Sequence, residues 1–463
     1  MANRVQPAVL VLGLAKSGYA AATALLARGV QVIVTDLQIS PLMRERARKL
    51  TALGAKVVLG EHPFHLLEQV NYIVTSPGVP DTAPIIMEAK RRRYPIISEP
   101  ELAYRLHRGL YIAITGSNGK TTTATWVQEI LSAAKIPAVL AGNIGQPLTA
   151  ALATVSPSSW VVAELSSFQL QYTDEFHPRI GAILNLSEDH LDRHGNFDAY
   201  VAAKANIFAR QKQQDILVLN ADNKTCQDLA TAASARIMFF SRKKILTAGA
   251  WVENGHIMLK WGSPSIPICP VHELGLPGEH NLENALATTC LTWAAGANSA
   301  AITNGLKTFS GLEHRCEQVA VIDGVNYIND SKGTNPNATL KAISAYAPPL
   351  ILIAGGKDEG ACLDVLLPVI KERCRAVILL GEVAGKFQQT LVKAGFTDVY
   401  RTETLPAAVQ LAQQLARPGE TVLLSPACAS FDMFSNYEQR GQVFKQAVAG
   451  LGGAERWKGG RTF

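Results

Sequence analysis

Apolar runs rich in β-branched residues alternate with stretches rich in Ala and Leu along most of the chain. This alternation predicts strands and helices in turn, and therefore parallel sheets covered by helices. In the first region the runs AVLVL, VQVIVTD and YIVT are predicted strands, and the helix after the first of them is predicted to end at Gly29. A loop rich in Tyr, Pro and Glu is predicted at residues 93–109, where this region ends.

The same pattern continues through two further regions. The second is predicted to begin with YIAIT and to contain strands at residues 160–164, 180–186 and 216–220, then a small β appendage at 241–275 and a helix at 275–296. The third contains the apolar runs VNYI, LILIAG, AVILL and TVLLS, each followed by a polar or glycine-containing turn. The chain is therefore predicted to form α/β domains at residues 1–106, 107–311 and 312–463.

Composition favours an ordinary globular protein. Hydrophobic residues make up 48% of the 463 positions and charged residues 18%, and the net charge is +6. The basic run KRRR at residues 90–93 is predicted to be a solvated helix face rather than a nucleic-acid patch. The 7 cysteines are scattered without a C-x-x-C pair, which predicts reduced thiols in a cytoplasmic protein. Neither a cleavable leader nor a membrane span is predicted.

The strongest candidate chemistry lies in the turn TGSNGKTTT, which follows an apolar strand pattern and precedes a helical one. It is shorter than the standard phosphate loop G-x-x-x-x-G-K-[ST]. Its two glycines allow the backbone to wrap a phosphate, Lys120 can reach the outer phosphates, and Thr121 can supply a magnesium ligand. The predicted phosphate-binding residues are Gly116, Ser117, Asn118, Gly119, Lys120, Thr121 and Thr122.

Two further motifs of this region are candidates for metal binding. Glu164 ends the strand WVVAE, and a carboxylate at the end of a neighbouring strand is the usual second magnesium anchor of phosphate-loop enzymes. In EDHLDRHG, His190 and His194 are four residues apart. Zinc would need a further protein ligand that the spacing does not provide, so a shared magnesium fits better. A hydrogen-bonded loop histidine is the simpler alternative for each.

Near the amino terminus, Gly13, Gly18 and Asp36 resemble a dinucleotide fingerprint, but their spacing is G-x-x-x-x-G rather than G-x-G-x-x-G. A redox cofactor is therefore disfavoured. A nucleotide diphosphate at the following helix N-terminus is the favoured interpretation, because free amide groups attract anions there. Plain packing of strand against turn is the alternative.

Polar residues also gather at the predicted strand ends of the third region, where open α/β sheets bind ligands. Singly, each is most simply a surface residue. Together they predict a basic, hydroxyl-rich rim able to bind phosphate or carboxylate. They are His314, Arg315, Asp330, Ser331, Lys332, Lys357 and Ser430.

These motifs resemble those of the Mur ligase family, ATP-dependent amide-forming enzymes of peptidoglycan precursor synthesis. TGSNGKTT matches the family's short phosphate loop, ELSSFQL, NLSEDHLDRH and HNLENALA match its middle domain, and EHR and NDSKGTNPNAT match its last domain. The resemblance implies a Rossmann-like N-terminal domain for a UDP-linked substrate, a central P-loop-type ATP-binding domain and a Rossmann-like C-terminal domain for an amino acid.

Within the family, NDSKGTNPNAT and SPACASFDMFSNYEQRG look like the signatures of members that add D-glutamate to UDP-N-acetylmuramoyl-L-alanine. The D-N-P-R motif of the diaminopimelate- or lysine-adding members is absent. Folylpolyglutamate synthase, a related ligase, usually has G-K-G-S where this chain has GKTT. A different class, a P-loop NTPase switch, would hydrolyse nucleotide without a small-molecule acceptor.

The resemblance implies that the γ-phosphoryl group of ATP passes to the alanyl carboxylate, and that the amine of D-glutamate attacks the acyl phosphate. It implies two Mg²⁺ ions, one held by Thr121 and Glu164 and one by His190 and a carbamylated Lys204. Lys120, Glu164, His190 and Lys204 are then the catalytic residues. A monomer without nucleic-acid partners is expected.

The resemblance also assigns ligand-binding residues, and these follow by ligand. Further residues for ATP are Asn281, Asn284, Arg315, Asp330 and Lys332. Those for the UDP-linked substrate are Gly13, Asp36, Ser76, Gly78 and Asn143. Those for D-glutamate are Thr334, Lys357, Ser430, Phe431 and Tyr437.

Overall fold

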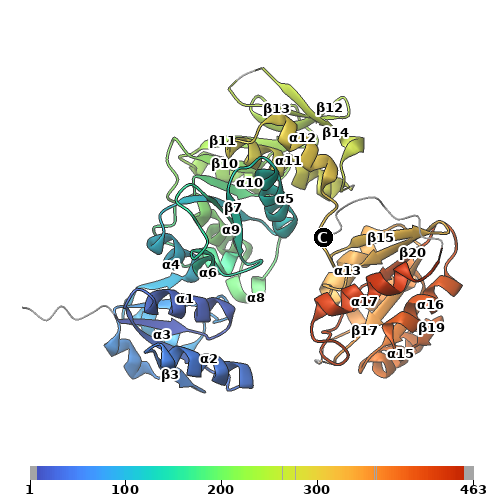
Figure 1. The fold of residues 1–463 in the computed structure, drawn as a ribbon, viewed down its shortest axis with the longest axis horizontal. Coiled ribbons are helices and arrows are strands. Elements are labelled where there is room, and N and C mark those ends of the chain that lie inside the picture. The colour runs from blue at the N-terminus through green and yellow to red at the C-terminus, as the bar shows by residue number, and fades with distance from the viewer. Residues whose placement is uncertain (1–7, 263, 277, 359, 361, 453–463) are drawn as a thin grey trace, which may run out of the picture. The chain divides into compact units, whose positions relative to one another are not determined.

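The structure, a computed structural model, describes residues 8–262, 264–276, 278–358, 360 and 362–452. It confirms the predicted α/β class, with helices packed on largely parallel sheets (Figure 1). The chain divides into two compact units, Met1–Phe309 and Ser310–Phe463, and the first unit contains two sheets.

The first sheet is parallel, with strand order β3-β2-β1-β4-β5 (Figure 1, blue). Successive residues of β1 alternate between two buried clusters, with Val9 and Val11 in one and Leu10 and Leu12 in the other, so both faces of the sheet are covered. The strands are β1 (Ala8–Leu12), β2 (Gln31–Asp36), β3 (Lys56–Leu59), β4 (Tyr72–Thr75) and β5 (Ile96–Ser98). The helices are α1 (Lys16–Leu26), α2 (Pro41–Ala52), α3 (Pro84–Arg91) and α4 (Glu99–Leu106).

The predicted loop at residues 93–109 is wrong, because β5 and α4 lie within it. Proline does not prevent the helix, since Pro100 stands in its first turn, where the missing N–H would have no helical partner. The Ser98 side chain caps that turn by accepting the N–H of Glu101.

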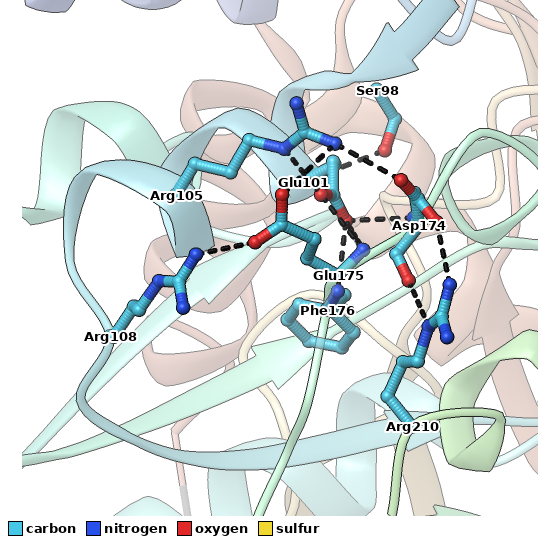
Figure 2. Close-up of polar contacts among 8 residues, drawn as sticks. All are labelled: Ser98, Glu101, Arg105, Arg108, Asp174, Glu175, Phe176 and Arg210. Atoms are coloured by element: carbon cyan, nitrogen blue, oxygen red, sulfur yellow. Dashed lines mark hydrogen bonds and ion pairs between the residues drawn. The ribbon is translucent and has the colours of Figure 1, made fainter.

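Glu101 joins α4 to the second sheet of the same unit (Figure 2). Its fully buried carboxylate accepts the backbone N–H groups of Asp174, Glu175 and Phe176 at 2.9–3.1 Å. Arg105, one helical turn later, donates to the same carboxylate at 2.6 Å. A buried charge is stable only when paired and hydrogen-bonded, and this one is both. The connection between the two sheets is therefore an ordered helix anchored by a charged cluster.

The second sheet has the order β14-β13-β12-β11-β10-β9-β6-β8-β7. It is parallel from β7 to β12, and β12, β13 and β14 add antiparallel pairs at one edge, which confirms the predicted β appendage. The strands are β6 (Leu110–Thr115), β7 (Ala138–Gly142), β8 (Trp160–Glu164), β9 (Ile180–Ile183), β10 (Ile216–Asn220), β11 (Arg236–Ser241), β12 (Gly249–Glu253), β13 (His256–Lys260) and β14 (Ile266–Pro270). The helices are α5 (Lys120–Ala133), α6 (Leu148–Ala151), α7 (Ser167–Leu170), α8 (Leu191–His194), α9 (Phe197–Ala205), α10 (Lys224–Leu229), α11 (Glu279–Ala294) and α12 (Ser299–Thr308).

The sheet of the second unit has the order β15-β16-β20-β17-β18-β19, and β15 runs antiparallel to β16. The central strand β17 is buried on both faces, as predicted for a strand covered by helices on each side. The strands are β15 (Glu317–Ile322), β16 (Val325–Asn329), β17 (Leu350–Gly355), β18 (Cys374–Leu380), β19 (Val399–Arg401) and β20 (Thr421–Leu424). The helices are α13 (Pro336–Ala345), α14 (Leu367–Arg373), α15 (Ala384–Lys393), α16 (Leu405–Leu415) and α17 (Tyr437–Ala449).

Two expectations from composition can be compared with the structure. All 7 cysteines are unpaired thiols. Across the described ranges, the helices are too short or too polar to span a bilayer.

Candidate active site

The turn between β6 and α5 has the predicted strand–turn–helix context. Gly119 has a left-handed backbone with φ of 83°, and a Cβ there would lie 2.2 Å from Asn284 Oδ1. A side chain at position 119 would therefore strain the backbone and would require the Asn284 side chain to move. The backbone of the turn is held by Asn185, whose side-chain oxygen accepts the N–H of Asn118 at 2.8 Å and whose main-chain oxygen accepts that of Ser117 at 2.9 Å. The turn is thus shaped before any phosphate binds.

Two lysines converge on one carbonyl of this turn. Lys120 Nζ donates to Gly116 O at 2.8 Å, and Lys204 Nζ donates to the same oxygen at 2.9 Å and to Thr115 Oγ1 at 3.1 Å. Lys204 is only 2% exposed. Burial, with the charge of Lys120 as a second cause, lowers the pKa of Lys204 to about 7. A large fraction of Lys204 is therefore a neutral amine near neutral pH.

Glu164 lies at the end of β8, which pairs with β6 directly before the turn. Its carboxylate is buried, and Oε1 accepts a hydrogen bond from Asn143 Nδ2 at 2.9 Å. Among the described residues, no donor reaches Oε2. A buried carboxylate oxygen without a donor suits a cation, and oxygen is the ligand that Mg²⁺ prefers. The structure also brings Asn143, assigned from resemblance to the UDP-linked substrate, into contact with the candidate metal ligand.

The two histidines of the EDHLDRHG motif have different surroundings. His190 has a left-handed backbone with φ of 54° and a side chain 50% exposed, and its ring lies 5.0 Å from that of Phe168. His194 shares a 2.9 Å hydrogen bond with Ser167 Oγ and stacks on Phe168 at 5.2 Å. His194 is therefore held by the protein, as the simpler alternative predicted, whereas His190 is accessible.

Asn281 and Asn284 lie on α11, which packs against α5. Both are buried, and Asn284 Oδ1 accepts a hydrogen bond from Thr123 Oγ1 at 3.3 Å. Since Asn284 also limits the space beside Gly119, the two asparagines border the phosphate turn. Thr121 and Thr122, on the first turn of α5, are half-buried.

The turn after β1 is tightly built in the first sheet. A Cβ on Gly18 would lie 1.8 Å from Gly13 O, and one on Gly13 would lie 2.8 Å from Ser76 Oγ. Asp36 accepts the N–H groups of Leu14 and Gln38 at 2.6 and 2.7 Å. The Ser76 hydroxyl is buried, and no partner for it occurs in the described part of the chain. Gly78, two residues later, is exposed.

In the second unit, the predicted rim is built at the carboxyl ends of β16, β17 and β20. Asp330 Oδ2 accepts a hydrogen bond from Ser425 Oγ at 2.7 Å, and burial raises the pKa of Asp330 to about 6. Lys357 N–H donates to Ala429 O at 3.0 Å. Thr334 and Lys357 line a small cavity of about 20 Å³.

The remaining rim residues, and the D-glutamate candidates Phe431 and Tyr437, differ in their exposure to solvent. Ser430 and His314 are buried, Phe431 is 64% exposed, and Arg315 is also exposed. Half-buried Tyr437 has Lys332 Nζ 5.8 Å from its ring centre. Ser331 of the rim is also buried.

Sequence reasoning left several structural residues of the site unassigned. Asn185 holds the phosphate turn, and Arg193 donates to two carbonyls of the loop after β4. Arg440 is buried and donates to Ser331 and to Cys428 O. Each lies inside a motif on which the family resemblance rests. A polar residue in such a motif that has no assigned role could therefore have been predicted to support the site.

Comparison with known families agrees with this geometry. Residues 7–98 match the N-terminal domain described as Mur ligase MurD-like, residues 114–292 match the Mur ligase middle domain, and residues 314–428 match the Mur ligase glutamate ligase domain. Solved structures with the same fold include MurF from Acinetobacter baumannii (TM-score 0.58, 17% identity, 90% of this chain and 91% of that one). Another is the UDP-N-acetylmuramate-alanine ligase MurC from Thermotoga maritima (TM-score 0.54, 19% identity, 96% and 99% covered). The chain belongs to the Mur ligase family.

More similar relatives define its branch. The protein named UDP-N-acetylmuramoylalanine--D-glutamate ligase from Pelotomaculum thermopropionicum is 42% identical over 96% of this chain and 97% of its own. The one of that name from Geobacillus kaustophilus is 44% identical over 95% and 97%. Within the family, the chain groups with these D-glutamate ligases.

Proposed function

We infer that the protein joins D-glutamate to UDP-N-acetylmuramoyl-L-alanine at the expense of ATP, a step of peptidoglycan precursor synthesis. The similarity to ligases of that name, over nearly the whole length of the chain, carries the inference. The phosphate turn, with a buried carboxylate at the end of the adjacent strand, supports phosphoryl transfer as the chemistry.

The reaction needs an activated acyl group, because a carboxylate is a poor acyl donor. The alanyl carboxylate attacks the γ-phosphorus of ATP, and ADP leaves. The amine of D-glutamate then attacks the acyl carbon, and phosphate leaves from the tetrahedral intermediate. Lys120 neutralises charge on the transferring phosphoryl group, and a contact of this kind contributes on the order of 3 kcal/mol to lowering a barrier. The N–H groups at the start of α5, which follow the two that Asn185 accepts, position the phosphates.

Thr121 and Glu164 would hold one Mg²⁺, and His190 with a carbamylated Lys204 a second; these ions would neutralise phosphate charge. The orphaned Glu164 oxygen and the accessible His190 ring support this donor set. In the described part of the chain, His, Cys, Asp and Glu side chains do not gather in threes as ready-made metal ligands. The ions would therefore need further ligands from substrate oxygens and water, as Mg²⁺ commonly does.

Carbamylation of Lys204 is supported by its protonation state. Only a neutral amine reacts with CO₂, and burial beside Lys120 favours that form. The carbamate that forms is an anion. Without it, two lysine side chains lie near the same carbonyl, Gly116 O. A carbamate would thus convert a site unfavourable for a second cation into a metal ligand.

We assign the ligands to domains at residues 1–106, 107–311 and 312–463. The first binds the UDP-linked substrate through Gly13, Asp36, Ser76 and Gly78, with Asn143 from the second domain. ATP is bound by the phosphate turn, Asn281 and Asn284, and from the last domain by Arg315, Asp330 and Lys332. D-Glutamate is bound by Thr334, Lys357, Ser430, Phe431 and Tyr437.

The protein acts as a monomer in the cytoplasm, where ATP and UDP-linked precursors are available. Its 7 unpaired cysteines agree with a reducing compartment.

The test measures phosphate release with ATP, Mg²⁺, UDP-N-acetylmuramoyl-L-alanine and a panel of amino acids. Of the amino acids in the panel, only D-glutamate should stimulate phosphate release, and Lys120→Ala should abolish that release. Stimulation by another amino acid or by a folate would instead indicate another Mur ligase or a folylpolyglutamate synthase-like enzyme. Equal ATP consumption without the muramoyl substrate would indicate a P-loop NTPase and overturn the proposal.

A further inference from the structure

Arg193 connects the segment that carries His190 to a loop of the first sheet. It lies on α8, and its guanidinium donates to Pro77 O at 3.0 Å and to Val79 O at 3.1 Å. These two carbonyls flank Gly78, in the loop that follows β4. Because the two donors belong to one planar group, they fix the orientation of the loop as well as its distance.

The same guanidinium also lies over the ring of Phe168, 4.1 Å from the ring centre. The same ring lies 5.0 Å from His190 and 5.2 Å from His194. Phe168 belongs to α7, which begins three residues after Glu164. One aromatic ring thus separates the arginine from the candidate metal ligand His190.

A second connection holds the same loop a few residues further on. Asp81 accepts hydrogen bonds from Tyr172 Oη and Gln171 Nε2, both at 2.6 Å. This contact lies beside α7 and not beside α8. Arg193 therefore relates the loop directly to α8, the segment that follows His190.

We propose that Arg193 is a positioning residue that sets the substrate-binding loop at residues 76–79 relative to His190. The proposal deepens the proposed function and rests on it, since it assumes that Ser76 and Gly78 meet the UDP-linked substrate. Phosphoryl transfer requires the attacking carboxylate within about 3–3.5 Å of its target, and a displacement of about 1 Å can cost about 100-fold in rate. A tie between the substrate loop and the metal-binding segment controls that distance.

Arginine suits this role better than lysine. A guanidinium stays charged at all working pH values and can serve both carbonyls with parallel N–H groups. The single ammonium of a lysine has no planar fork and would orient the loop less well. Partial recovery by lysine is therefore expected, and it separates positioning from the mere presence of charge.

The experiment compares Arg193→Met and Arg193→Lys with the control Arg210→Met. Arg210 also donates to a carbonyl and a carboxylate, both of Asp174, but outside the site (Figure 2). For each variant, kcat is measured together with KM for UDP-N-acetylmuramoyl-L-alanine and for ATP, with thermal unfolding alongside. In Arg193→Met, kcat should fall about tenfold or more and KM for the UDP-linked substrate should rise, while KM for ATP stays unchanged. Arg193→Lys should show an intermediate fall in kcat, and Arg210→Met should keep the wild-type values.

An unchanged kcat, or a rise in KM for ATP as large as the rise for the UDP-linked substrate, would overturn the positioning role. If Arg193→Met does not fold, kcat of Arg193→Lys decides the matter, with a wild-type value counting against the role. A wild-type protein without D-glutamate-dependent phosphate release would overturn the proposed function, and this inference with it. An active wild type with an unaffected Arg193→Met overturns the inference alone.

Discussion

Removing CO₂ should inactivate the protein, and the loss should be easiest to produce at slightly acidic pH. The perturbation acts on Lys204, whose proposed carbamate forms from the neutral amine and decomposes when protonated. Its surroundings are fixed by Thr115 and Gly116, which accept its hydrogen bonds. Two such bonds use both N–H groups of a neutral amine and leave the nitrogen lone pair for CO₂.

The magnitude follows from the pKa of Lys204, which is about 7 rather than the ordinary 10.5. At pH 7 roughly half of the side chain is then neutral, against about 0.03% of an ordinary lysine, a gain of more than about 1,000-fold. Because the folded-state pKa is lowered, the neutral fraction rises with pH, from about 10% at pH 6 to about 90% at pH 8. Reactivation should therefore be about ninefold faster at pH 8 than at pH 6, at equal dissolved CO₂.

The assay begins with dialysis against CO₂-free buffer at pH 6, followed by phosphate-release measurements with and without added bicarbonate. Protein treated with ¹³C-bicarbonate should show one carbamate signal by NMR, which Lys204→Met abolishes. Lys204→Ala should be inactive and partly recovered by a short carboxylic acid, which replaces the missing anion. Activity that is indifferent to CO₂, together with the absence of a carbamate signal, would refute the reasoning.

Three further substitutions test other contacts. Gly119→Ala adds a left-handed strain of about 1–2 kcal/mol and displaces the Asn284 side chain. The same loss in ATP binding would raise KM for ATP about 5- to 30-fold. Gly54→Ala, at φ of 98° in open space, should leave KM unchanged. Glu101→Gln should lower the free energy of unfolding by about 2–4 kcal/mol in urea, and an unchanged midpoint would contradict its structural role. Glu164→Gln should reduce kcat about 100- to 1,000-fold and raise the Mg²⁺ needed for half-maximal rate; unchanged Mg²⁺ dependence would exclude it as a ligand.

The strands that carry the site could be predicted because each is a buried apolar run that ends in a polar residue or glycine. The predicted strands at 160–164 and 216–220 coincide with β8 and β10. Short strands such as β5 and β19 escaped prediction, since three residues give too little periodicity to detect. The loop predicted at 93–109 was wrong for a different reason. Prolines that suggest a loop are also compatible with the first turn of a helix.

Motifs in the sequence predict the phosphate-binding turn and Glu164 as site residues. The contacts that hold such residues in place depend on the fold. The hydrogen bond from Asn143 to Glu164 spans 21 positions, and those from Arg193 to the loop after β4 span 114 and 116. No local pattern in the chain encodes such separations. The sequence therefore predicts candidate residues for the chemistry, and only the structure reveals the residues that orient them.

The pairing of Lys120 with Lys204 gives these observations a common electrostatic basis. Two cations near the same carbonyl of the phosphate turn repel each other, and the buried one loses its charge more easily because it has less access to water. Neutral Lys204 no longer opposes the charge of Lys120, the group that we propose to meet the outer phosphates. A carbamate at Lys204 would go further and attract both Lys120 and a metal ion. The burial that appears costly for one lysine thus preserves the charge of the other for phosphoryl transfer.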